Sequence, residues 1–221
     1  QSVLNGESGI ECMDTWTNEL IETGYLHNHA RMWYASIWIH TLKLPWTLGA
    51  DFFLRHLYDG DAASNTLSWR WVAGLHTQGK SYLASASNIE KYTEGRFQPE
   101  TSFAKTAVEL ADDYAKPDAR PIQKLPESDL SGRVGYLIHE ENLAAVEWLP
   151  AEAGDSVAMA GYFPLEAYSQ YGIESEVIQF RQTCMADRLG EDAQTLTDAA
   201  SLIAWAERFE LDSIVMPEPP I

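Results

Sequence analysis

The stretch from Arg31 to Trp71 combines side chains that suit the binding and tuning of an aromatic cofactor. Among its residues are an arginine, two aspartates separated by a glycine, an amide and several tryptophans, namely Arg31, Trp46, Asp59, Gly60, Asp61, Asn65, Trp69 and Trp71. The nucleophile elbow that is typical of Ser–His–acid hydrolases is absent from the sequence. This mixture therefore fits a planar, redox-active aromatic cofactor better than it fits hydrolysis.

Asp59 and Asp61 flank Gly60 where one predicted helix ends and the next begins. A turn followed by a helix cap explains this spacing without any ligand. The functional alternative starts from the N-terminus of the following helix, whose free N–H groups and positive potential favour an ionised carboxylate. Such a carboxylate would pair with Arg31 and tune a neighbouring cofactor.

Asn65 and Trp69 are four positions apart on one predicted helix, so their side chains lie on the same face. Trp71 is about 200° further round this helix and is expected to line a different wall of a cavity. Trp46 follows a proline, and we expect it to lie behind Trp69. Core packing is the ordinary role of a tryptophan, but six of the eight tryptophans fall in the first third of the chain.

Five short helices in succession predict a compact all-α unit that positions these residues. Their expected ranges are 14–23, 28–42, 48–58, 64–73 and 80–94, with Ser64 as the N-cap of the fourth. Part of the next stretch, 102–114, is expected to be helical. Prolines and charges then predict a linker over 116–130, so that the helical domain covers 1–115.

The remaining residues, 131–221, alternate between strand and helix patterns. Strands are expected at 133–138, 156–162 and 213–216, and helices at 174–189 and 193–209. This alternation predicts a small α/β domain with a parallel sheet. The expected fold class is therefore α+β overall, with an all-α domain followed by a small α/β domain.

The composition limits the compartment and the partners. The chain has 33 acidic and 15 basic residues and a net charge of −18, which repels nucleic acid unless a local patch binds it. No apolar run is long enough to span a membrane and no secretory leader is recognisable, so we expect a cytoplasmic location. The sequence leaves the oligomeric state open. The first and last residues indicate a fragment or a processed form.

The histidines and cysteines predict neither a metal site nor a disulfide framework. His27 and His29 flank Asn28, and histidines two positions apart on a helix point to different faces, which makes a poor metal pair. Cys12 and Cys184 are far apart in the sequence and have no CxxC partner. Each is expected to be a small buried hydrophobic residue.

Three runs of residues occur at fixed spacing, with no gap from Gly24 to Trp71; they are Glu19–Met32, Asp59–Asn65 and Trp69–Trp71. With these runs, the stretch 8–97 resembles the helical FAD-binding domain of the photolyase/cryptochrome family. More narrowly, it is similar to bacterial photolyase-related proteins in which Ala73–Lys80 replaces the usual segment after the tryptophans.

The resemblance implies FAD as the cofactor and assigns residues to it. Arg31 matches the arginine that pairs with the first aspartate, Asp59. Asp59, Gly60 and Asp61 match the positions that hold the isoalloxazine ring and nearby groups. Asn65 matches the residue that faces flavin N5, where asparagine is the choice of photolyases.

The resemblance also implies an electron relay and a pocket for damaged DNA. Trp69 and Trp46 match the proximal and middle tryptophans that photoreduce the flavin. Asn28, Met32 and Trp71 match positions around the pocket for a flipped-out pyrimidine dimer.

The sequence departs from the family at several points. His29 replaces an arginine near the DNA backbone, and the distal tryptophan has no counterpart, although Trp16, Trp33 or Trp38 could substitute for it. The Thr-Ser-x-Leu-Ser segment that binds the FAD phosphates and the upstream glutamate of the lesion pocket are absent. We therefore expect this chain alone to hold half of a flavin cradle. The α/β half follows the helical domain, whereas the family's antenna domain usually precedes it.

Three functions follow as hypotheses. The first is a light-driven photolyase-like enzyme in the full-length parent, a deoxyribodipyrimidine photo-lyase that repairs pyrimidine dimers by electron transfer from reduced FAD. The second is a cryptochrome-like blue-light receptor without repair activity, which the net charge and His29 favour and Asn65 does not. The third is a fragment that no longer binds flavin. The sequence does not identify the lesion, an antenna chromophore or the role of the α/β half.

Overall fold

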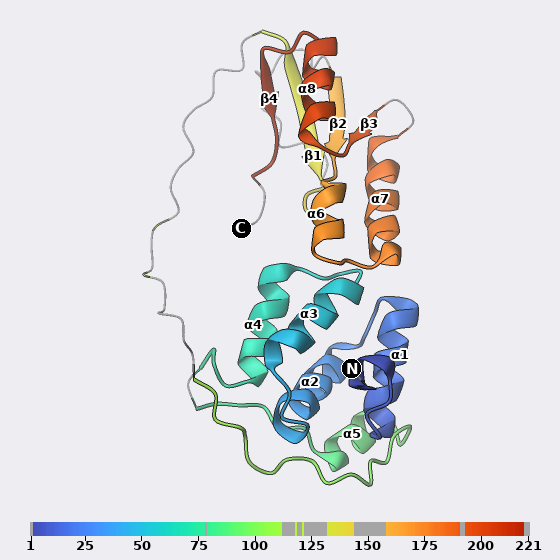
Figure 1. Cartoon of the computed structure of the whole chain (residues 1–221), viewed down its shortest axis with the longest axis vertical. Coiled ribbons are helices and arrows are strands. Elements are labelled where there is room, and N and C mark those ends of the chain that lie inside the picture. Colours follow the sequence, from blue (N-terminus) through green and yellow to red (C-terminus); the bar gives the residue numbers. More distant parts are fainter. Residues whose placement is uncertain are drawn as a thin grey trace. The chain divides into compact units, whose positions relative to one another are not determined.

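The computed structural model describes residues 2–77, 79–111, 118, 121, 132–143, 158–190 and 193–218. The chain divides into two compact units, Gln1–Pro117 and Asp118–Ile221. Figure 1 shows the first as a cluster of helices and the second as a small sheet with helices, and the α+β fold class is thereby confirmed. The predicted linker, 116–130, lies outside the described residues except for 118 and 121.

The helical unit contains a 3₁₀ turn, five α-helices and one π-helical turn within its described residues. These are η1 (Ser2–Asn5), α1 (Glu11–Thr23), α2 (Asn28–Ser36), the π-turn η2 (Ile37–Thr41), α3 (Trp46–His56), α4 (Ala62–Val72) and α5 (Ala86–Tyr92). α2 and η2 together occupy the single helix that the sequence predicts. Five helices in succession are confirmed, and most of their ends lie one to six residues from the predicted ones.

Four helices start at other residues than predicted: α1 starts at Glu11 and not at 14, α3 at Trp46 and not at 48, α4 at Ala62 and not at 64, and α5 at Ala86 and not at 80. A cap residue explains the starts of α4 and α5. Asp61, and not Ser64, is the N-cap of α4, because its carboxylate accepts the backbone N–H of Ser64 at 2.6 Å. α5 begins only after Ser85, whose hydroxyl accepts the N–H of Asn88. In both cases a cap side chain, more than the apolar pattern, sets the first turn.

The helix predicted over 102–114 is wrong for its described part, since 102–111 forms no helix. The backbone of this segment bonds to side chains of η2 instead of to its own carbonyls. The N–H of Ala104 donates to the Thr41 hydroxyl, and the N–H of Val108 donates to Nδ1 of His40. A tertiary anchor therefore overrides the local helical pattern.

Gly24 ends α1 in the left-handed conformation, with φ of 66°, as the sequence predicts. A side chain at this position would overlap the ring of Tyr58. The carbonyl of Gly24 also accepts the N–H of Tyr58 at 2.9 Å. This close approach fixes the start of α2 against the loop that carries Asp59.

The core of the helical unit is rich in aromatic rings. Its fully buried large side chains include Trp33, Tyr34, Phe53 and Trp69. Trp16 stacks on Trp33 with their ring centroids 5.7 Å apart. Several tryptophans therefore pack in the core, which is the ordinary role of this residue.

The second unit is a four-stranded, all-parallel sheet in the order β3-β2-β1-β4. Its elements are β1 (Val134–His139), β2 (Ala158–Tyr162), α6 (Leu165–Gln170), α7 (Ser175–Leu189), β3 (Gln194–Leu196), α8 (Ala199–Arg208) and β4 (Ser213–Val215). In register, Leu137 lies beside Ala160 and Val134 beside Ser213. The predicted parallel sheet is confirmed.

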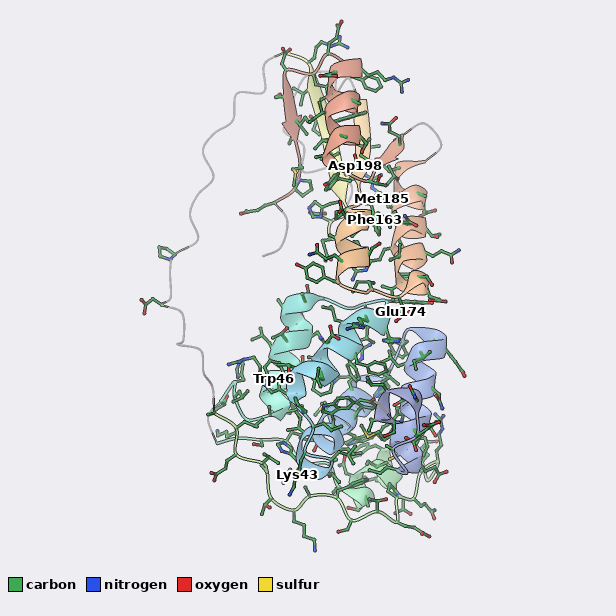
Figure 2. All side chains as sticks on the ribbon, in the orientation of Figure 1. Lys43, Trp46, Phe163, Glu174, Met185 and Asp198 are labelled. Atoms are coloured by element: carbon green, nitrogen blue, oxygen red, sulfur yellow. The ribbon has the colours of Figure 1, made fainter. Side chains whose placement is uncertain are left out.

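Two elements of this unit escape the sequence prediction. α6 is a short helix that was not expected, and β3 lies inside the range predicted as the helix 193–209. The reason is a capping box: the carboxylate of Asp198 accepts the N–H of Ser201 and starts α8 only there. Residues 156 and 157 of the predicted second strand lie outside the described residues. Phe163 and Met185, labelled in Figure 2, belong to one buried cluster beside the sheet.

Candidate functional site

A cavity of about 390 Å³ lies in the helical unit, lined by residues of α2, α3 and α4 and of the loop between α3 and α4. Nine of the ten residues predicted for the site line it: Asn28, Arg31, Met32, Asp59, Gly60, Asp61, Asn65, Trp69 and Trp71. Trp46 is not among its lining residues. These nine predicted residues, which are up to 43 positions apart in the sequence, thus line the same cavity.

An ion pair forms one edge of the cavity. Nη2 of Arg31 lies 3.0 Å from both carboxylate oxygens of Asp59. Nε of the same guanidinium donates to the carbonyl of Leu26 at 2.7 Å, and the group lies over the ring of Tyr25. The side chain of Asp59 is 58% exposed, so the pair is formed without the large desolvation cost of a fully buried pair.

Asp61 and Gly60 make the turn that leads into α4. One carboxylate oxygen of Asp61 accepts the N–H of Ser64, so the capping interpretation of this aspartate is correct. A side chain at Gly60 would lie 3.0 Å from the carbonyl oxygen of Leu57, which is tighter than ordinary contact. Both residues also line the cavity, so the helix N-terminus and its positive potential lie at the cavity.

Asn65 is fixed by a bond to the neighbouring helix. Its Nδ2 donates to the carbonyl of Ala50 on α3 at 2.7 Å. The orientation of the amide is therefore set by the protein before any ligand binds. An amide held in this way presents a defined hydrogen-bonding edge to the cavity that it lines.

Trp69 forms a buried wall of the cavity, with 2% of its surface exposed. Its ring meets Phe53 edge-on at 5.1 Å and Trp38 edge-on at 6.3 Å. A side chain at Gly49 would overlap this indole. Gly49 is therefore needed for the position of Trp69, and the sequence offers no signal for that requirement.

Trp46, labelled in Figure 2, stands at the first position of α3. Its side chain is half-buried. The guanidinium of Arg70 lies over its ring, 5.9 Å from the centroid. Within the described part of the chain, no ring contact joins Trp46 to Trp69. The indole in ring contact with Trp69 is instead Trp38, which the sequence names only as a substitute for a distal tryptophan.

The residues predicted for a DNA pocket lie on the same cavity. Trp71 is 40% exposed and stacks on Tyr82 with centroids 5.6 Å apart. Nδ2 of Asn28 approaches the sulfur of Met32 at 4.0 Å on α2. Trp71 thus shares one cavity with Trp69, and an apolar, half-open wall adjoins the ion pair.

His27 and His29 do not point to different faces of one helix. His27 is the N-cap of α2 and accepts the N–H of His29 through Nδ1, so it precedes the helix. The two rings lie 5.3 Å apart, and His29 stacks between Trp33 and Tyr92. No group of three potential metal ligands occurs among the residues that the structure describes.

The two cysteines differ from each other in burial. Cys12 is buried, as predicted, and burial raises the pKa of its thiol to about 11. Cys184 is only half-buried. In the described ranges, no helix is long and apolar enough to cross a membrane.

Sequence reasoning missed one histidine at the cavity and a second that bonds to a residue of its wall. His76 lines the cavity. His40 is buried and accepts the N–H of Val108 at Nδ1, so its Nε2 carries the proton and donates to the carbonyl of Val72, itself a cavity residue. Burial lowers the pKa of His40. The neutral ring therefore ties η2 to the end of α4, through partners that its sequence neighbours do not reveal.

The comparisons with known proteins agree with one another over the helical unit. The model of the FAD binding domain of DNA photolyase matches residues 2–131. A deoxyribodipyrimidine photo-lyase of Streptomyces griseus is 44% identical over 73 residues, which are 33% of this chain and 16% of that protein. A cryptochrome DASH of Idiomarina loihiensis is 32% identical over 103 residues, 47% of this chain and 22% of that protein.

A deoxyribodipyrimidine photo-lyase of Neurospora crassa matches a longer stretch, with 29% identity over 135 residues, 61% of this chain and 20% of that protein. The chain thus spans about a fifth of the length of the curated relatives that it matches. No solved structure matches it significantly.

Proposed function

Because this chain belongs to the family defined by the FAD binding domain of DNA photolyase, we propose that its helical unit contributes part of an FAD site. We propose further that the whole protein uses this site for light-driven repair of pyrimidine dimers in DNA. The observation that carries the proposal is the meeting of nine predicted residues at one cavity.

The residues at the cavity fit a flavin ring. The volume of about 390 Å³ falls in the range of small-molecule and cofactor sites, roughly 300–1,000 Å³. Phe53, Leu57 and Trp69 offer an apolar wall, and Arg31 with Asp59 offers a charged edge. An apolar surface with a few fixed polar groups is what a planar heteroaromatic ring requires.

Each side chain has a role that follows from its contacts. FAD, when bound, supplies the light-driven electron transfer. Arg31 and Asp59 orient the polar edge of the ring and set the local electrostatic potential. Asn65, held by Ala50, presents its amide at a fixed position. Trp69 excludes water from the apolar wall and stands close enough to the cavity to donate an electron.

The lesion pocket is proposed at the exposed part of the same cavity. Met32 and Trp71 offer apolar surface for contact with a flipped-out pyrimidine dimer, and Asn28 offers an amide beside them. The chain's charge of −18 opposes DNA at long range, so the contact depends on local groups, of which the guanidinium of Arg31 and the imidazole of His76 line the cavity.

A blue-light receptor without repair activity is the second candidate function. The net charge and His29, which replaces an arginine of the family, favour it. The two functions differ in their affinity for damaged DNA, since a repair enzyme binds it with a marked salt dependence and a receptor binds it weakly.

A repair assay tests the proposal directly. The whole protein, loaded with reduced FAD, is mixed with an oligonucleotide that contains a thymine dimer. The mixture is then exposed to blue light. We expect light-dependent loss of the dimer, which a Trp71→Leu variant reduces. A flavin-loaded protein that shows a light-driven spectral change but no repair would support the receptor and reject the enzyme.

A further inference from the structure

We infer that Trp38 is an electron-relay partner of Trp69, on a buried branch that competes with the expected route through Trp46. This inference rests on the proposed function, because photo-excited oxidised flavin is the one-electron oxidant that it requires. It adds to the site a residue that does not line the cavity.

The geometry of the two indoles is that of direct contact. The rings of Trp38 and Trp69 meet edge-on, with an interplanar angle of 87° and centroids 6.3 Å apart. Both are nearly inaccessible, with 3% and 2% of their surfaces exposed. Trp69 lines the cavity, so Trp38 stands one aromatic ring behind it. No solvent separates the two rings, and little reorganisation accompanies an electron exchange between them.

A local irregularity of the backbone accompanies this contact. Trp38 lies in the π-turn η2, in which the N–H of Leu42 bonds to the carbonyl of Ile37. π-turns inside helices are rare overall, and those that occur are often found at functional sites. Two residues of η2 reach α4: Trp38 through the Trp69 ring and His40 through the carbonyl of Val72.

The electrostatic surroundings favour a positive charge on Trp38 over one on Trp46. The indole N–H of Trp38 donates to the carbonyl of Pro45 at 2.8 Å, and this bond strengthens when the ring becomes positive. The ring of Trp46 has the guanidinium of Arg70 over it at 5.9 Å. A like charge at that distance opposes oxidation of Trp46.

The electron balance of the step is simple. Excited oxidised flavin removes one electron from Trp69, which becomes a radical cation. Trp38 then gives one electron to Trp69, which returns to its neutral form, and Trp38 becomes the radical cation. No bond forms or breaks, and the proton stays on Nε1 of Trp38, because the partner of this N–H is a backbone carbonyl and not a base.

The branch ends at Trp38. Tyr34 stacks on it with centroids 6.1 Å apart, but the Tyr34 phenol is fully buried and bonded to the hydroxyl of Thr17. Burial raises the pKa of Tyr34 to about 12, so its oxidation, which requires loss of the phenolic proton, is disfavoured. Trp38 therefore holds the positive charge in its cationic form and returns it to Trp69.

Three single variants test the branch: Trp38→Phe, Trp46→Phe and, as a matched control, Trp16→Phe, a buried indole that stacks on Trp33. Transient absorption after a blue flash on the FAD-loaded chain follows the tryptophan radicals. We expect Trp38→Phe to lower the yield of the long-lived indole cation by about a factor of two or more, because the rates of parallel routes add. The control should not change it.

Near-ultraviolet circular dichroism and thermal unfolding of each variant separate the relay from a structural effect. Loss of the cation signal in a Trp38→Phe protein that keeps its fold and its flavin supports the relay. An unchanged cation yield in that protein, or a yield that falls equally in Trp16→Phe, overturns it.

A chain that binds no FAD would reject the proposed function but would still test the branch. In that case azide radicals, which oxidise tryptophan by one electron, generate indole radicals by pulse radiolysis. The branch predicts a persistent cation component from a buried indole that Trp38→Phe removes and Trp16→Phe leaves. Absence of this component in the unsubstituted chain contradicts the branch.

Discussion

The helical unit and the α/β unit use their polar side chains differently. In the helical unit, Arg31, Asp59 and Asn65 surround a cavity and leave it open to a ligand. In the α/β unit, Arg181 donates to Tyr168 and pairs with Glu141, and Tyr168 donates to Glu140. These bonds tie the end of β1 to α6 and α7.

The difference explains why only one unit yields a functional hypothesis. Tyr168 also stacks on the buried ring of Phe163, with centroids 4.7 Å apart. The polar network of the α/β unit therefore holds Tyr168 against the core, which is a structural role. In the helical unit, Arg31 likewise pairs with Asp59, but this pair lines a cavity beside the apolar side chains of Phe53 and Leu57. A few polar groups that converge on a mostly apolar cavity are typical of a binding site.

The largest expected effect tests whether the two units are independent. Trp205→Ala removes a buried indole that packs on Leu137 and Leu196 and should destabilise the α/β unit by about 3–5 kcal/mol. Urea unfolding followed by circular dichroism measures this. FAD affinity of the helical unit should stay unchanged, and its loss would show that the units are coupled.

The next effect concerns the ion pair at the cavity. Asp59→Asn removes the charge opposite Arg31 and should weaken FAD binding by about tenfold, or roughly 1.4 kcal/mol. Asp51→Asn is the matched control, because Asp51 pairs with Arg55 on α3 and does not line the cavity. Equal losses in the two variants would mean that the Arg31–Asp59 pair has no special role.

The helical unit should also respond to mild acid through His40. Its pKa is lowered by burial, so below the ordinary pKa near 6.5 the unfolded chain binds a proton that the folded unit does not. Stability should fall as the pH drops below about 6.5, with a slope of at most about 1.4 kcal/mol per pH unit. His40→Gln, which keeps a donor and an acceptor, should flatten this dependence in pH-dependent thermal unfolding.

The smallest effect compares two helix caps. Asp61 caps α4 at the cavity, and Asp198, labelled in Figure 2, caps α8. Asp61→Ala should destabilise the helical unit by about 1 kcal/mol and weaken FAD binding. Asp198→Ala should lower only the melting temperature of its own unit. An unaltered FAD affinity in Asp61→Ala would restrict Asp61 to capping.

In the helical unit, the sequence predicts the order of the helices but not all of the contacts between them. Helix succession, the end of α1 at Gly24 and the convergence around Arg31 and Asp59 follow from local patterns and fixed spacing. The contact of Trp38 with Trp69 does not, because it depends on the π-turn and on how η2 packs against α4. The helix prediction for 102–111 is wrong for a similar reason, since the backbone of this segment bonds to Thr41 and His40.

In the α/β unit, the alternation of patterns predicts the parallel sheet, but β3 is three residues long and leaves no periodic signal. The capping box at Asp198 separates it from α8. Short elements are set by caps and by pairing partners, which a pattern of hydrophobic residues does not contain.

An equilibrium titration of FAD into the purified chain tests the central claim most directly, because a flavin ring against Trp69 loses its fluorescence by electron transfer from the indole. We predict saturable quenching of flavin fluorescence in the unsubstituted chain and a marked recovery of fluorescence in a Trp69→Phe chain that still binds FAD. Absence of saturable binding, or binding without quenching in the unsubstituted chain, would contradict the assignment of this cavity to a flavin.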